Sequence, residues 1–258
     1  MTTLDFTPAP GAAPLPRMVL AQAEAEVRAT LRNGEQLLLM LIVPILLLVG
    51  FSAAPLLDLG GRRVDFVAPG VIALAIMSMA FTGQAIATGF ERRYGVLKRL
   101  GATPLSRRGL MLAKTLAVIT VEAVQVALIV VVALALGWRP HGDPVGAPLS
   151  AALLILLATA AFSGLGLLMA GTLRAEATLA AANLVYLVLL GIGGVVFPVD
   201  RFPEGVRPLI EALPITALTG GLRSALGGSA GFPTGQALVL ACWAVLLLAL
   251  AAWTFRWE

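Results

Sequence analysis

The chain has 258 residues, of which 59% are hydrophobic and only 12% charged, and its mean hydropathy is +0.94. Soluble domains are about half apolar and about one quarter charged, so this composition excludes an ordinary water-soluble globule. The net charge of +4 is better explained by basic loops kept in the cytoplasm than by nucleic-acid binding. A single His and a single Cys exclude a disulfide framework and give no basis for a metal site or a Ser/His or Cys/His catalytic pair.

The N-terminal region divides into a tail and a helix. Residues 1–16 contain four prolines and are predicted to be a disordered tail. Over residues 17–35, Leu20, Val27 and Leu31 fall on one helical stripe, which predicts an amphipathic helix. Such a helix either lies at the membrane surface or is simply solvated, and the pattern does not separate the two.

The remainder, residues 36–258, predicts an all-α polytopic domain of six transmembrane helices, because each apolar run is bounded by polar or proline-rich connections. The six segments are Leu37–Phe51, Phe66–Phe90, Leu110–Gly137, Leu149–Leu173, Ala177–Phe197 and Gln236–Phe255. The first is short and contains Pro44, which predicts a kink that neighbouring helices accommodate.

The distribution of Lys and Arg predicts the orientation. Twelve of these residues fall on one side of the six spans and six on the other. Positive charge concentrates on the cytoplasmic side, so both termini and the connection 91–108 are expected in the cytoplasm, with the chain in the cell membrane and in contact with its lipid.

The connection 91–108 has more order than a charged loop requires. Phe90, Tyr94, Leu97 and Leu100 share one face of a helix, while charged residues occupy the other. Thr103-Pro104 is expected to begin the next helix after a break at Gly101, with Thr as N-cap. We favour a short helix that docks on a protein; the alternative is a basic loop that contacts anionic lipid.

The connection 198–231, on the other side, is long and rich in apolar residues. Prolines cut it into pieces, among them Pro198, Pro203 and Pro214, and Arg223 lies in the last piece. We predict two short helices that dip back toward the membrane; a small extracellular cap is the alternative.

Polar residues within the spans are candidates for a transport pathway. Glu122 lies near the middle of the third span, with Gln125 one turn away on the same face. A carboxylate there is costly, so it is expected to face protein or water and to have a partner. Either it lines a route for a polar or cationic group, or it forms an interhelical hydrogen bond to Gln84, Asn183 or Tyr186.

Small residues in the fourth span allow another helix to approach closely. Ala160/Gly164 and Gly166/Ala170 are spaced four residues apart. They serve either contact with a second copy of the chain or packing within one copy. Gly193-Gly194 is expected only to allow close packing.

The chain resembles the permease subunits of ABC-2-type transporters, small exporters of drugs, antibiotics, polysaccharides and lipids. Three features over nearly the whole length carry the resemblance: the six-span layout after an amphipathic helix and two motifs. The motifs are Glu91-Arg-Arg…Gly95…Leu97…Leu100…Thr103-Pro104…Ser106 and Phe197-Pro198…Phe202-Pro203…Leu213-Pro214…Arg223. The resemblance implies that 17–35 is the connecting helix, 91–108 the coupling segment seated in an ATPase subunit, and 198–231 the re-entrant segment.

The resemblance also implies the function. The chain contains no G-x-x-x-x-G-K-[ST] phosphate loop, so we expect no ATPase activity in it and expect ATP and Mg to bind a separate ATPase subunit. Two permease copies, identical or homologous, would enclose the pathway for a hydrophobic or amphipathic cargo, as in multidrug efflux. The rivals are an ion-coupled carrier or channel that uses Glu122 and, less supported by the scattered acids, an enzyme acting on lipid.

The candidate site residues fall into three groups. The coupling group is Glu91, Arg92, Arg93, Tyr94, Gly95, Leu97, Lys98, Arg99 and Leu100; the pathway group is Glu122, Gln125, Gln84, Asn183 and Tyr186; the re-entrant group is Pro198, Pro203, Pro214 and Arg223. In the coupling group, Tyr94, Leu97 and Leu100 are expected to pack on the ATPase, with the charged residues setting orientation.

Overall fold

The computed structural model describes residues 11–53, 62–195, 198–228 and 231–254, without the side chains of 35–37 and 39. In this part of the chain the fold is all-α, with no β-strand. Its elements are α1 (Leu15–Arg32), α2 (Gly34–Ala53), α3 (Arg63–Ile76), η1 (Met77–Gly83), α4 (Gln84–Arg93), α5 (Val96–Gly101), α6 (Arg107–Ala135), α7 (Gly146–Thr172), α8 (Ala175–Ile192), η2 (Val199–Arg201), α9 (Arg207–Glu211), α10 (Pro214–Leu226) and α11 (Thr234–Thr254).

Five of these helices are long and apolar enough to cross a membrane. They are the continuous Arg63–Arg93, which joins α3, η1 and α4, together with α6, α7, α8 and α11; a shorter apolar helix, Met40–Ala53, lies within α2. The prediction of a polytopic all-α membrane protein is confirmed, with the shorter apolar helix at the place of the short first span. Pro44 is accommodated inside α2 without ending it.

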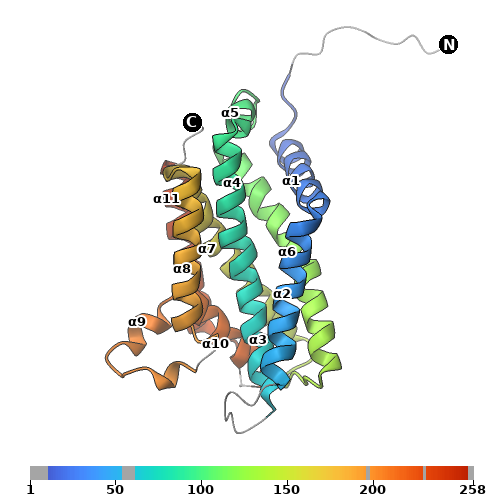
Figure 1. Ribbon diagram of the computed structural model, residues 1–258, viewed down its shortest axis with the longest axis vertical. Coiled ribbons are helices and arrows are strands. Elements are labelled where there is room, and N and C mark those ends of the chain that lie inside the picture. Colours follow the sequence, from blue (N-terminus) through green and yellow to red (C-terminus); the bar gives the residue numbers. More distant parts are fainter. Residues whose placement is uncertain (1–10, 54–61, 196–197, 229–230, 255–258) are drawn as a thin grey trace, which may run out of the picture.

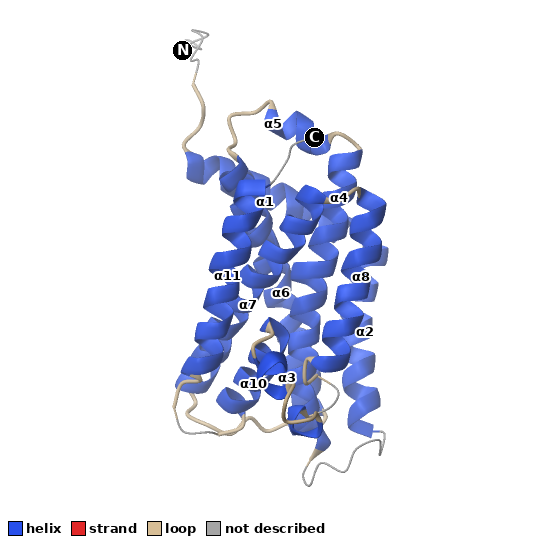
Figure 2. Cartoon of the chain, turned by 90° about the vertical axis from the view of Figure 1, so that its left-hand side faces the viewer, coloured by secondary structure: helices blue, strands red, loops and turns tan. Residues whose placement is uncertain are grey.

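The long helices run side by side and give the molecule two distinct ends (Figure 1). One end carries α1, α5 and the C-terminal part of α11, and we call it the α5 end. The other carries α9 and α10 and is called the α10 end; Figure 2 shows the same separation from the side. The two elaborate connections thus lie at opposite ends, as their places in the sequence predict.

Helix α7 lies at the centre of the bundle and packs most extensively on α11. Two glycines allow neighbouring helices to approach α7 closely. A Cβ on Gly164 would lie 2.9 Å from the Leu247 Cβ of α11, and a Cβ on Gly166 would lie 2.9 Å from the Phe81 carbonyl oxygen of η1. These two small residues therefore serve packing within the chain, the second of the two alternatives left open by the sequence.

The N-terminal helix differs from its prediction in both bounds and face. It begins at Leu15, with Pro16 in its first turn, and ends at Arg32, so it is shifted from the predicted 17–35. Its buried residues are Val19 and Ala23, whereas Leu20 and Leu31 of the predicted apolar stripe are exposed. The contact with α6 buries a different face of the helix, and most of the predicted apolar stripe is left exposed.

Candidate functional site

The segment after the second span is a helix–turn–helix step and not one continuous helix. Helix α4 ends at Arg93, and Gly95 adopts a left-handed conformation with φ of 73° before α5 begins at Val96. A residue with a side chain is strained at this φ, so glycine fits the turn. The predicted uninterrupted helix over 91–100 is therefore wrong: the break comes at Gly95, and Gly101 is the last residue of α5.

The next helix starts later than predicted. Its N-cap is Ser106, whose hydroxyl accepts a hydrogen bond from the Gly109 N–H at 3.1 Å. Thr103 is not the cap; its hydroxyl donates to the Leu100 carbonyl at 2.6 Å and so closes the end of α5. Both residues suit an N-cap chemically, so composition could not choose between them.

The residues predicted to form one docking face point in different directions. Leu97 is fully buried in a cluster with Val19, Leu105 and Leu110, so it packs inside the chain. Tyr94 is 67% exposed, and Leu100 lies between these extremes. Leu97 thus anchors α5 to the bundle, while Tyr94, in the turn before α5, lies on the outer surface of the protein.

The two arginines before the turn bind elsewhere in the chain. Arg92 donates to the carbonyls of Ala170 and Leu173, both at 2.9 Å, and so caps the end of α7. Arg93 forms an ion pair with Glu176 at the start of α8 and lies over the Tyr94 ring. Lys98 and Arg99 are exposed on α5. The position of α5 is therefore tied to the ends of two spans.

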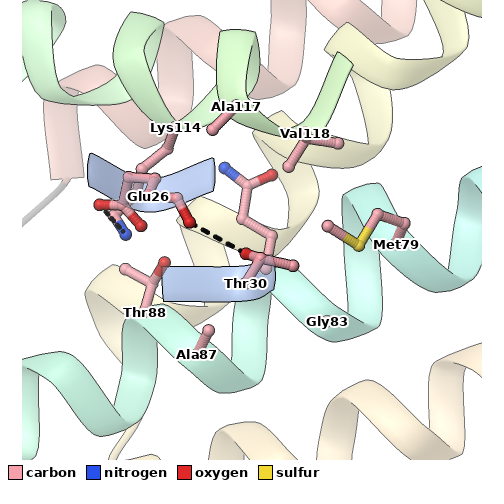
Figure 3. A pocket seen from close by; sticks show the side chains of 10 residues that line it. Glu26, Thr30, Met79, Gly83, Ala87, Thr88, Lys114, Ala117 and Val118 are labelled. Carbon is pink, nitrogen blue, oxygen red and sulfur yellow. Dashed lines mark hydrogen bonds and ion pairs between the residues drawn. The ribbon is translucent and has the colours of Figure 1, made fainter. Parts of the chain in front are cut away.

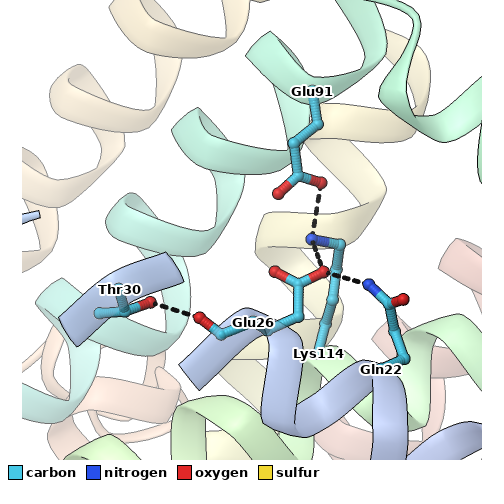
Figure 4. Close-up of polar contacts among 5 residues, drawn as sticks. All are labelled: Gln22, Glu26, Thr30, Glu91 and Lys114. Atoms are coloured by element: carbon cyan, nitrogen blue, oxygen red, sulfur yellow. Dashed lines mark hydrogen bonds and ion pairs between the residues drawn. The ribbon is translucent and has the colours of Figure 1, made fainter. Parts of the chain in front are cut away.

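Glu91, predicted to orient a partner protein, instead joins a buried ionic triad (Figure 4). The Lys114 ammonium lies 2.7 Å from a Glu91 carboxylate oxygen and 2.9 Å from a Glu26 carboxylate oxygen, and Gln22 also donates to Glu26. The Lys114 side chain is only 4% exposed. The triad links α1, α4 and α6.

One feature of the sequence is a signal of this triad. Lys114 lies inside the apolar stretch that begins at Leu110, and an ionisable residue inside a span needs a partner. The count of basic residues that predicts the orientation does not reveal these partners, because they come from other helices.

A pocket adjoins the triad between α1, η1, α4 and α6 (Figure 3). It contains about 380 Å³ of empty space, counted out to its open mouth. Its walls are both polar and apolar, and the lining residues are Glu26, Thr30, Met79, Gly83, Gln84, Ala87, Thr88, Lys114, Ala117 and Val118. The pocket lies where η1, a π-helical stretch of the kind often found at functional sites, passes into α4.

Glu122 and Gln125 are both buried within the bundle, on one face of α6 as predicted. Thr159 of α7 donates a 2.6 Å hydrogen bond to one Glu122 oxygen, and the other oxygen has no partner among the described residues. The Gln125 amide donates to the Met40 carbonyl of α2 at 2.7 Å. Glu122 therefore has an interhelical partner, but one that the sequence did not identify.

The other predicted pathway residues are not brought to Glu122. Gln84 lines the pocket described above, Asn183 is exposed and bonds the Leu179 carbonyl of its own helix, and Tyr186 packs at the edge of the main apolar core. None of the three hydrogen-bonds Glu122. Of the five residues proposed from the sequence, only Glu122 and Gln125 thus lie together.

At the α10 end, the connection contains the two predicted short helices, α9 and α10. Pro214 stands in the first turn of α10, whose residues are largely buried between α3, α7 and α11. Pro198 precedes η2, and Pro203 lies in the turn that follows it. Phe197 of the sequence motif lies outside the described residues.

Arg223 fixes α10 in place. Its guanidinium donates to the carbonyls of Gly194 at 2.7 Å and Val195 at 3.3 Å, and it lies 3.6 Å from the centre of the Phe66 ring. Gly193 allows Ile215 of α10 to pack closely against the chain after α8, since a Cβ on Gly193 would lie 2.4 Å from a methyl of Ile215. The expectation of close packing at Gly193-Gly194 is confirmed.

The comparison with known families agrees with this architecture. A family model described as ABC-2 type transporter matches residues 19–226, which runs from α1 to the end of α10. No curated protein matches the chain at a significant level.

Proposed function

The chain belongs to the ABC-2 type transporter family, whose members are the membrane components, or permeases, of transporters and are not themselves catalytic. We propose that this chain is the permease subunit of an exporter and that a separate ATPase subunit drives it. ATP and Mg would bind that partner. A second permease copy, identical or homologous, would complete the pathway, and the cargo would be a hydrophobic or amphipathic drug, antibiotic or lipid-like molecule. Both termini and α5 would lie in the cytoplasm of a cell-membrane protein.

The position of α5 carries this proposal. It stands beyond the second span at the α5 end (Figure 1), where its Leu97 is buried and Tyr94, just before it, is exposed. Only a rigidly attached element can pass a partner's movement to the spans, because a loose one would absorb it. Arg92 and Arg93 tie the approach to α5 to the ends of α7 and α8, so a push on α5 would reach several spans at once.

The test of coupling is Tyr94→Ala in the co-expressed complex. Tyr94 supplies a large exposed aromatic surface, and buried aromatic anchors dominate many interfaces. We expect the amount of ATPase subunit that co-purifies to fall at least about tenfold. Folding of the permease should be unchanged, because Tyr94 contributes little to the interior.

The matched control is Phe232→Ala, which removes an exposed aromatic ring at the opposite end of the bundle. It should leave ATPase recovery unchanged. Full recovery of a coupled, stoichiometric complex with Tyr94→Ala would contradict the proposed docking surface. Leu97→Ala is unsuitable for this test because it removes a buried side chain.

The proposed pathway is tested separately at Glu122. Glu122→Gln keeps an oxygen that can accept the Thr159 hydrogen bond but removes the ionisable carboxyl group, and we expect export of a cationic cargo to fall about tenfold. Recovery of the ATPase subunit should be unchanged. Unaltered transport would remove Glu122 from the pathway.

The ion-coupled carrier remains the rival use of Glu122. It requires transport by the purified chain alone, driven by an ion gradient. Gradient-driven uptake into vesicles that lack any ATPase would favour the carrier over the proposed exporter.

A further inference from the structure

The pocket beside the ionic triad contains buried polar groups that the fold leaves unused. Gln84 is 6% exposed and Thr88 is fully buried. The amide nitrogen and oxygen of Gln84 and the hydroxyl of Thr88 have no hydrogen-bond partner within the described residues. Buried polar groups in folded proteins are nearly always paired, so these groups are suited to bind something that enters the pocket.

The charges around the pocket are unbalanced. The triad holds two carboxylates, Glu26 and Glu91, against the single ammonium of Lys114. The nearest arginines along α4, Arg92 and Arg93, are engaged by α7 carbonyls and by Glu176. A monovalent cation in the pocket would neutralise the remaining negative charge, whereas an anion would increase the imbalance.

The rest of the wall is apolar. Met79, Ala87, Ala117 and Val118 line it, from η1, α4 and α6 (Figure 3). Small-molecule pockets typically combine such apolar walls with a few polar groups that fix orientation. The enclosed part of the pocket is small and suits a head group such as an ammonium, so an attached apolar body would extend toward the open mouth.

We propose that this pocket binds the ammonium head of an amphipathic organic cation. The N–H groups of the head would donate to the Glu26 carboxylate, the Gln84 amide oxygen and the Thr88 hydroxyl, and its apolar body would lie along Met79 and Val118. A quaternary ammonium fits the charge but has no N–H to donate, so it should bind more weakly. This binding would depend on the pocket alone, so the proposal does not rest on whether an ATPase drives the chain.

The experiment uses the full chain in lipid nanodiscs and a decylamine probe that carries a photoreactive diazirine near its amine. After irradiation and digestion, we expect labelled residues on the pocket walls from α1, α4 and α6. Thr88→Val should reduce this labelling about fivefold to tenfold, because it removes one hydrogen bond to a charged head. Unlabelled decylamine should compete, and decanol or decyltrimethylammonium should compete at least about fivefold less well.

The matched control is Thr216→Val. Thr216 is another buried threonine whose hydroxyl has no partner among the described residues, but it lies in α10 at the opposite end. It should leave pocket labelling unchanged. Labelling confined to exposed residues such as Leu184 and Leu187, or equal labelling of wild type and Thr88→Val, would overturn the proposal and leave the pocket to water alone.

Discussion

The two ends of the bundle are built from different interactions. At the α5 end, ion pairs between different helices accompany the apolar cluster around Leu97, with Lys114 between Glu26 and Glu91 and with Arg93 paired to Glu176. At the α10 end, apolar packing dominates, and Arg223 donates to backbone carbonyls and not to a carboxylate.

The difference indicates how each end can respond to force. A helix movement that exchanges one ionic partner for another keeps each charge paired, whereas a closely packed interface has few alternative arrangements. The α5 end is therefore the end at which a partner or a ligand could shift the helices, and the α10 end is the end that stays fixed. Three substitutions test this contrast.

The largest effect is expected at Lys114. Lys114→Met leaves two carboxylates buried without their counter-charge, and breaking a buried pair in this way costs about 3–5 kcal/mol. The free energy of unfolding in mixed detergent micelles measures it. The triple variant with Glu26→Gln and Glu91→Gln removes the unpaired charges and should recover most of the loss; a triple variant as unstable as the single one would contradict the ionic account.

A smaller loss is expected at Arg223. Arg223→Met leaves the Gly194 and Val195 carbonyls without a donor, and hydrogen bonds to a charged group contribute about 1.5–3 kcal/mol. The same unfolding measurement applies. Arg201→Met, an exposed arginine at the same end, should change stability by less than about 0.5 kcal/mol. Equal effects of the two substitutions would mean that Arg223 does not fix α10.

The smallest effect is expected from one methyl group in the packed end. Gly193→Ala places a Cβ against Ile215 and should cost about 1–3 kcal/mol, the usual range for overpacking. Gly191→Ala, two residues earlier, has open space around its Cβ and should be neutral or slightly stabilising because alanine favours the helix. If both variants unfold alike, the close contact at the end of α8 is not a constraint.

Much of the fold was predictable from local pattern. Apolar length located the spans, and the prolines of residues 198–231 marked the breaks between the short helices α9 and α10. The first residues of the helices and the positions of the turns were less predictable. At the start of α6, Thr103 and Ser106 have similar capping chemistry, and only the backbone geometry selects Ser106.

The candidate sites were only partly predictable. The exposed Tyr94 and the buried Glu122 are where the sequence placed them, but Leu97 is turned inward and Glu91 serves the interior. A helical wheel assumes one continuous helix, and the turn at Gly95 rotates everything after it.

The sequence by itself determined the solvent, the places of the apolar helices and the two ends to which the long connections belong, because hydropathy and charge act over neighbouring residues. Tertiary structure alone decided which groups meet. Glu26 and Lys114 are 88 residues apart, and Thr159 is 37 residues from Glu122. No local pattern encodes such pairs, since each depends on how whole helices pack against one another.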